Sequence, residues 1–280
     1  MHEDSEAYRC GAIRECFEES GILLARPCGA AGGSLTREML NVSAEERQAG
    51  REAVHASRSG FCEWVREKGG VLDLGGLIPF TRWLTPKSVK RRYTTQMYLY
   101  FLPLFDLPRP HLKNQSAQIP TSDGGIEHTE AVFDYAEEWL RRSRAREIVL
   151  FPPQVYLLTL IAHHLKPLEP SHRELDASDQ RIALDEQRVR LMEMIQDEEE
   201  DPSWGKKCIS PRPLHRDDKM VTMALDYAGD EVQEANRRGD LTRVMMWGLE
   251  KSGPADVELR KRSEVEQKNK SRAGRYQEKL

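Results

Sequence analysis

The chain has few cysteines, and no two of them stand at a metal-binding spacing. Its five cysteines are odd in number, are scattered over 280 residues and include no Cys-x-x-Cys pair. This pattern argues against a zinc site and against the disulfide framework of a secreted domain. The cysteine content therefore favours a reducing, intracellular compartment.

Long apolar runs and an excess of positive charge are also missing. No run of apolar residues is long enough to span a bilayer, and Met1 does not begin a hydrophobic signal peptide. The net charge of -4 gives no overall attraction to nucleic acid or to an anionic membrane. We therefore expect neither a membrane nor a nucleic-acid partner, and the oligomeric state stays open.

The chain does contain an acidic cluster close to its start. Glu15, Glu18 and Glu19 are three or four positions apart, so on a helix their carboxylates share one face. Three like charges repel one another, and a hard divalent cation such as Mg²⁺ or Mn²⁺ relieves the conflict because it prefers carboxylate oxygens. An ordinary solvated acidic face is the competing interpretation.

The neighbours of these glutamates complete the helix. Arg14 precedes Glu18 by one turn and can hold its carboxylate, while Ile13 and Phe17 are spaced to face the core together. Gly21 is expected to end the helix, because glycine readily adopts the left-handed cap conformation.

Residues 14–22 read Arg-Glu-Cys-Phe-Glu-Glu-Ser-Gly-Ile and resemble the R-E-U-x-E-E-x-G-U core of the Nudix box. Glu6 falls at the family's further glutamate and could buttress Arg14. The resemblance implies a Nudix-type α/β/α sandwich with a mixed sheet. It also implies an Mg²⁺- or Mn²⁺-dependent hydrolase of nucleoside diphosphates linked to another group. Glu15 and Glu19 would be metal ligands, Glu18 a ligand or the base, and Arg14 the residue that orients Glu18.

The chain departs from the box at its first position. The family's box opens with a glycine six residues before Glu6, which here would precede Met1. We therefore expect a chain truncated before the box glycine, with a sheet that is incomplete at the N-terminus. A lost strand leaves an unpaired edge, so we expect reduced stability, and a non-catalytic Nudix-like binding module stays an alternative.

A second segment narrows the resemblance. Residues 77–86 and 91–99 read L-I-P-F-T-R-W-L-T-P and R-R-Y-T-T-Q-M-Y-L, which is similar to the acyl-CoA diphosphatase branch of the family. That branch also has a helical insertion before this strand. The substrate implied is CoA or acyl-CoA, and the products are adenosine 3',5'-bisphosphate and (acyl)phosphopantetheine. ADP-ribose, a dinucleotide or capped RNA are alternatives, because all of these hydrolases share the box.

Three further residues are candidates for the site. Arg91 and Arg92 directly precede the predicted strand 93–101 and could contact substrate phosphates through bidentate hydrogen bonds. Two solvent-facing arginines are an equal alternative. In many Nudix enzymes a later glutamate reaches the metal or orients the attacking water. Glu130 is our candidate for that role, with Glu127 behind it, and a simple surface role is the alternative.

The composition divides the chain into four parts. We assign residues 1–165 to the Nudix domain, with a helical insertion at 27–75 that includes a helix capped by Ser43 and Glu46. Residues 147–162 predict a strand, a turn and an apolar helix. Residues 166–218 are rich in charge and predict a partly disordered excursion. Residues 219–262 predict a β-strand appendage, and 263–280 a disordered basic tail.

The last three residues bear on the compartment. Glu278-Lys279-Leu280 is similar to the peroxisomal address Ser-Lys-Leu, but Glu replaces the small residue. We expect an intracellular protein, with peroxisome, mitochondrion and cytoplasm all open.

Overall fold

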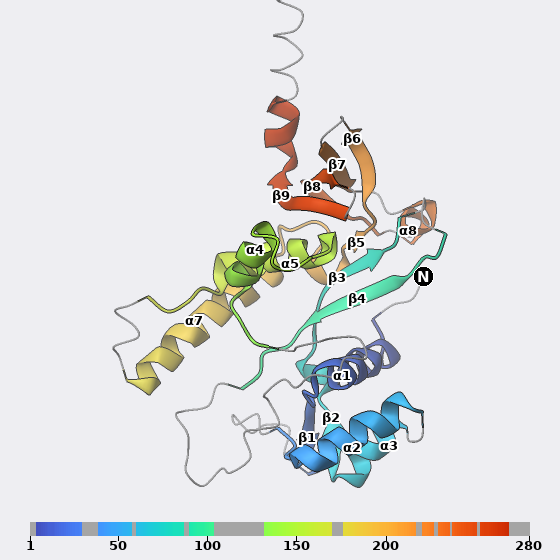
Figure 1. The fold of residues 1–280 in the computed structure, drawn as a ribbon, viewed down its shortest axis with the longest axis vertical. Coiled ribbons are helices and arrows are strands. Elements are labelled where there is room, and N and C mark those ends of the chain that lie inside the picture. The colour runs from blue at the N-terminus through green and yellow to red at the C-terminus, as the bar shows by residue number, and fades with distance from the viewer. Residues whose placement is uncertain are drawn as a thin grey trace, which may run out of the picture.

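The computed structural model describes residues 4–29, 39–57, 60–86, 90–103, 132–169, 176–216, 220–226, 229–235, 237–250 and 253–268. The fold is α/β with a mixed central sheet, as the sequence predicts. Figure 1 shows a strand pair between two layers, with helices α1 to α3 on one side and helices α4, α5 and α7 with a second sheet on the other.

The central sheet has the strand order β4-β3-β5. Strand β3 (Ile78–Leu84) pairs antiparallel with β4 (Thr94–Leu99) and parallel with the short strand β5 (Cys208–Ile209). The strand predicted at 93–101 is therefore present. Its alternation has the expected effect, because Tyr98 and Tyr100 pack against one hydrophobic cluster while Met97 and Leu99 pack against another.

The first cluster, here the α1 cluster, lies on the side of the insertion. It joins Ile13 and Phe17 of α1 (Glu6–Ser20) to residues of α2 (Ala44–His55) and α3 (Phe61–Glu67). The helix predicted from its capping box is present, and Ser43 and Glu46 make both reciprocal bonds of that motif. Strands β1 (Ala25–Pro27) and β2 (Gly70–Leu72) pair antiparallel at the two ends of this segment, and the 3₁₀ turn η1 (Leu74–Gly76) leads into β3.

The second cluster, here the α5 cluster, lies on the opposite face of β3. Its helices are α4 (Ala136–Arg144), α5 (Pro152–His164) and α7 (Ala177–Ile195). Residues 147–151 form no strand, contrary to our prediction, and Val149 and Phe151 are 72% and 62% exposed. Pro152 and Pro153 instead begin α5, where a missing backbone N–H costs nothing.

The charged segment 166–218, for which we expect a partly disordered excursion, forms a helix, a turn and strands in the part that the structure describes. It contributes α7, the turn η3 (Trp204–Lys206) and strand β5. Leu191 and Ile195 of α7 and the indole of Trp204 are buried in the α5 cluster. Burial of these apolar side chains stabilises the folded segment, although its average composition is strongly charged.

The β-strands predicted between residues 219 and 262 are present within a four-stranded antiparallel sheet. It consists of β6 (Arg212–Arg216), β7 (Met220–Leu225), β8 (Asp240–Glu250) and β9 (Gly253–Lys261) in that order, with the short helix α8 (Asp230–Glu234) between β7 and β8. Leu225 and Met245 join the α5 cluster, so this sheet shares its core with the rest of the fold. Residues 262–268 are helical and bury Val265, whereas we expected disorder from 263.

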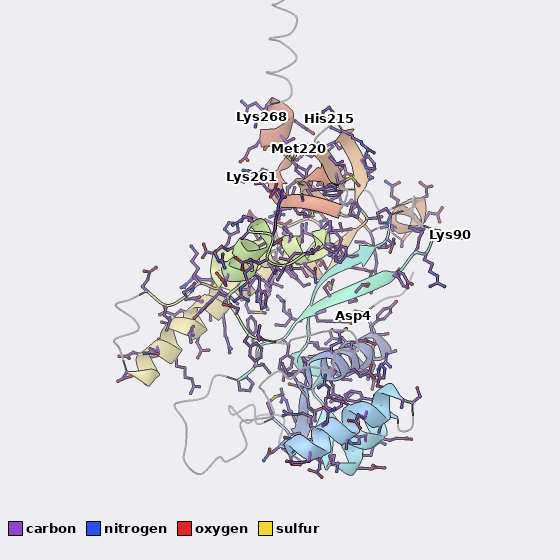
Figure 2. All side chains as sticks on the ribbon, viewed as in Figure 1. Asp4, Lys90, His215, Met220, Lys261 and Lys268 are labelled. Atoms are coloured by element: carbon purple, nitrogen blue, oxygen red, sulfur yellow. The ribbon has the colours of Figure 1, made fainter. Side chains whose placement is uncertain are left out.

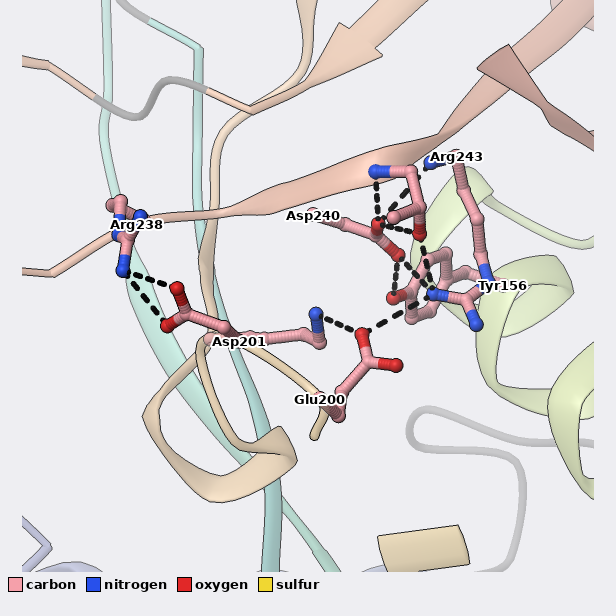
Figure 3. Close-up of polar contacts among 8 residues, drawn as sticks. Tyr156, Glu200, Asp201, Arg238, Asp240 and Arg243 are labelled. Atoms are coloured by element: carbon pink, nitrogen blue, oxygen red, sulfur yellow. Dashed lines mark hydrogen bonds and ion pairs between the residues drawn. The ribbon is translucent and has the colours of Figure 1, made fainter. Parts of the chain in front are cut away.

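A buried polar network also attaches this sheet to α5 (Figure 3). The Tyr156 hydroxyl on α5 donates to Asp240 on β8 at 2.6 Å, and both side chains are fully buried. Arg243 donates to the same carboxylate at 3.0 Å. Lys207 lies beside this network, where it forms a 2.6 Å ion pair with Glu200. None of the helices described is both long and apolar enough to cross a membrane.

Candidate active site on helix α1

Helix α1 begins at Glu6 and ends where the sequence predicts. Gly21 follows it with φ 73°, a left-handed conformation, and its N–H donates to the Phe17 carbonyl at 2.9 Å. Ser20 adds a second local bond, because its hydroxyl donates to the Cys16 carbonyl at 2.6 Å. The end of the acidic helix is therefore fixed by its own residues as well as by its neighbours.

The apolar face of α1 lies against the insertion. Ile13 and Phe17 are fully buried, as predicted. The ring of Phe17 lies 5.5 Å from that of Phe61 and 5.0 Å from that of Trp64, measured between centroids. Aromatic contacts at these distances add to the free energy of burial, and they leave the opposite face of α1 directed outward.

The predicted acidic residues lie at different depths on this side of the helix. Glu15 is exposed, Glu19 is half-buried, and the Glu18 side chain retains only 14% exposure. Arg14 forms ion pairs with Glu15 and, at 3.5 Å, with Glu18, as expected from their spacing. The Glu18 Oε1 atom is buried and accepts no hydrogen bond.

The three carboxylates do not converge. Among the described residues, no group of three or more Asp, Glu, His or Cys side chains is arranged to hold a metal ion. The donor set nevertheless fits a hard cation in its chemistry, because it offers carboxylate oxygens on one helix face. The buried Glu18 Oε1 atom accepts no hydrogen bond, and its ion pair with Arg14 is long, at 3.5 Å, so a cation would add a closer partner for it.

Two arginines hold α1 at its two ends. Near its start, the Arg9 guanidinium donates to the carbonyls of Leu74 and Leu77, at 2.7 and 3.0 Å. Near its end, Arg51 of α2 donates to the carbonyls of Glu18 and Glu19. The helix is thereby tied to the turn before β3 and to the insertion.

Asp4 strengthens the attachment at the start of α1. It accepts hydrogen bonds from Arg9 at 2.7 Å and from the Tyr98 hydroxyl of β4 at 2.6 Å, and Figure 2 shows it beside β4. Burial opposes ionisation of Asp4, but the bonds from Arg9 and Tyr98 outweigh it and keep its pKa below the ordinary value. Burial and the bond to Asp4 raise the pKa of Tyr98.

Those of the other predicted site residues that the structure describes are not gathered around the acidic face. Glu6 begins α1, and eight helical residues place it about 12 Å along the axis from Arg14, so it does not buttress that arginine. Arg91 and Arg92 are exposed near the start of β4, and Arg92 donates to the Thr85 carbonyl at 3.1 Å. Figure 2 shows their neighbour Lys90 at the outer end of the β3–β4 pair. Glu130 and Glu127 lie outside the described residues.

Sequence reasoning missed Arg51 and Asp4. Arg51 belongs to α2 and its carbonyl partners are 32 and 33 residues away in the chain. The one available signal is that Arg51 falls on the apolar side of a helix predicted from its capping box, one turn before Val54. For Asp4 no local pattern indicated the bond to Tyr98.

Comparison with known proteins gives the chain its family context. A family model described as the NUDT19 Nudix domain matches residues 2–161. The acyl-coenzyme A diphosphatase NUDT19 of Gallus gallus is 33% identical over 162 residues, which cover 54% of this chain and 39% of that protein. The protein of the same name from Xenopus laevis is 30% identical over 173 residues, or 60% of this chain and 42% of that protein. The chain thus spans about two fifths of the length of either relative.

A solved structure also has some similarity to this chain. The Nudix hydrolase from Alicyclobacillus acidocaldarius aligns with a TM-score of 0.42 and 22% sequence identity, over 58% of this chain and 64% of that one.

Proposed function

The chain belongs to the family described by the NUDT19 Nudix domain, and on that premise we propose that it is a metal-dependent diphosphatase acting on CoA or acyl-CoA. The products would be adenosine 3',5'-bisphosphate and (acyl)phosphopantetheine. The observation that carries the proposal is the acidic face of α1, a helix that Arg9 and Arg51 fix near its two ends. The names of the two curated relatives support the substrate class.

In this proposal the residues of the acidic face bind the metal ion, orient one another and accept a proton. Glu15 and Glu19 would hold Mg²⁺ or Mn²⁺ together with Glu18. The bound ion would neutralise charge on the diphosphate and lower the pKa of a bound water. Arg14 orients Glu18 through their 3.5 Å ion pair.

Glu18 also accepts the proton of the attacking water, because its Oε1 atom accepts no hydrogen bond from the protein. The water oxygen forms a bond to one phosphorus while the bond from that phosphorus to the bridging oxygen breaks. The bridging oxygen leaves on the other phosphate. Glu130 is proposed to orient the water, and Arg91 and Arg92 to contact the substrate's phosphates.

The test is an assay of the purified chain with Mn²⁺ against acyl-CoAs, ADP-ribose and dinucleotides. Wild type is compared with Glu19→Gln and with Glu45→Gln, a matched control that removes an acidic residue from the first turn of α2. We expect CoA cleavage by wild type and Glu45→Gln, and its loss by at least two orders of magnitude in Glu19→Gln. Equal turnover by wild type and Glu19→Gln would refute the metal mechanism.

A non-catalytic Nudix-like binding module is the second candidate. It is favoured by one observation, that the described carboxylates do not converge on a metal site. The same panel distinguishes the two, because a binding module would bind a nucleotide in equilibrium dialysis without releasing product. Preferential cleavage of ADP-ribose or a dinucleotide would support the proposed hydrolase activity but would refute CoA as the substrate.

A further inference from the structure

One buried polar side chain of the insertion donates hydrogen bonds to the backbone of the acidic helix. Arg51 lies on α2 and is only 4% exposed. Its Nε and Nη2 atoms donate to the Glu18 carbonyl at 3.1 and 2.7 Å, and Nη2 also donates to the Glu19 carbonyl at 3.0 Å. A buried guanidinium therefore spans two successive carbonyls of α1.

These carbonyls lie in the last turn of the helix. The last four carbonyls of an α-helix lack an intrahelical partner and need one from elsewhere when they are buried. The Gly21 N–H donates to the Phe17 carbonyl. Arg51 donates to the next two carbonyls, those of Glu18 and Glu19. Its positive charge also lies at the negative end of the helix dipole, where a cation is stabilising.

The position of Arg51 is itself fixed by close packing of the insertion. Gly50 precedes it, and a Cβ atom on Gly50 would lie 2.3 Å from Cζ2 of Trp64. Helices α2 and α3 therefore meet with no room for a side chain at this point. Trp64 in turn packs on Phe17 of α1 at 5.0 Å, so the guanidinium and the helix end belong to one rigid contact.

We propose that Arg51 is a positioning residue for the metal ligands on α1, and that the helical insertion contributes it to the site. Fixing the carbonyls of Glu18 and Glu19 fixes the direction in which both side chains leave the helix. Arginine is suited to this role because its planar fork holds two acceptors at once, whereas a lysine ammonium offers a single point. This inference rests on the proposed function, because the ligands are those of the proposed metal site.

The test compares wild type with Arg51→Met, Arg51→Lys and Val54→Ala. Val54 is buried on the same helix, one turn beyond Arg51, and its truncation weakens the α1 cluster while leaving the guanidinium in place. Two readouts need no turnover: Mn²⁺ affinity of the substrate-free protein, measured by electron paramagnetic resonance, and amide hydrogen exchange along α1.

For Arg51→Met we expect about a tenfold loss of Mn²⁺ affinity, the scale seen when residues that orient metal ligands are removed. Exchange should become faster in the last turn of α1, at residues 17–21, and not in its first turn. Arg51→Lys should fall between Arg51→Met and wild type. Val54→Ala should lower the melting temperature and keep wild-type Mn²⁺ affinity.

Two outcomes would overturn the proposal. If Arg51→Met melts earlier but binds Mn²⁺ as wild type does, Arg51 stabilises the fold without positioning the ligands. If its last-turn exchange is unchanged, the arginine does not hold the helix end. Failure of wild type to bind Mn²⁺ would instead refute the proposed function and the inference with it, and the exchange data would still report whether Arg51 holds the helix end.

Discussion

Replacing Tyr156 with Phe tests how firmly the C-terminal sheet is attached to the rest of the fold. The substitution removes one hydroxyl, which donates to Asp240 at 2.6 Å. It keeps the ring, whose edge-to-face contact with Trp83 has a centroid distance of 5.3 Å. The change therefore removes a hydrogen bond between α5 and β8 without creating a large cavity.

The expected loss follows from what remains around Asp240. Its carboxylate still accepts from Thr242 at 2.9 Å and from Arg243 at 3.0 Å. Because only one of several bonds to a buried, charged acceptor is lost, Tyr156→Phe should lower the free energy of unfolding by about 1.5–3 kcal/mol. Asp240→Asn should cost more, about 3–5 kcal/mol, because it also leaves the charge of Arg243 without its buried partner.

The assay is urea unfolding followed by tryptophan fluorescence and by far-ultraviolet circular dichroism. The central sheet and the C-terminal sheet β6–β9 share the α5 cluster. The two signals should therefore change in one transition, shifted to a lower urea concentration in Tyr156→Phe. A loss below about 0.5 kcal/mol would mean that the hydrogen bond contributes little. Two separate transitions would refute the shared core.

The same network predicts a pH dependence. Burial opposes ionisation of Asp240, but the charges of Arg243 and Lys207 and the Tyr156 bond outweigh it, so its pKa lies below the ordinary 3.8. The unfolded state then takes up the proton first as the pH falls. This stabilisation is therefore fully present above pH 3.8 and is lost as the pH falls through the lower folded pKa. Asp240→Asn should lack that part of the acid-induced loss.

Three further substitutions test the packing of α1 and α2 and the cap of α2. Gly50→Ala should cost about 1–3 kcal/mol by overpacking against Trp64, seen as a lower melting temperature, and an unchanged value would contradict the close contact. Phe17→Ala should cost about 3–5 kcal/mol in urea unfolding because the ring is fully buried, and a loss below 1 kcal/mol would argue against its burial. Ser43→Ala should cost about 1 kcal/mol by removing the cap bond to Glu46; hydrogen exchange should increase in the first turn of α2, and no local change would argue against the cap.

The parts of the fold that follow from local patterns could be predicted. Ile13 and Phe17 are one turn apart and both are buried, Gly21 ends α1, and the alternation in β4 divides its side chains between two clusters. Each of these depends on neighbours within four residues.

The features that local patterns do not predict depend on distant partners. Residues 147–151 have a strand-like composition, but a strand also needs a second chain segment beside it. The charged segment 166–218 contains few apolar residues, yet Leu191 and Ile195 find a core formed by helices far away in sequence. For the site, the acidic face could be predicted from the Nudix box, whereas the bonds from Arg51 to α1 could not, because they join residues more than 30 positions apart.

The parallel pairing of β3 with β5 has a consequence for how the chain folds. Arg82 of β3 is in register with Cys208, more than a hundred residues later. Contacts of such long sequence separation are slow to form, because the entropy of closing the loop is lost before the contact is gained. During synthesis the acidic helix, the insertion and β3 emerge well before this second partner of β3. We expect the edge of β3 that pairs with β5 to stay unpaired until about residue 209 has been synthesised. A chaperone that covers strand edges would reduce aggregation most during that interval.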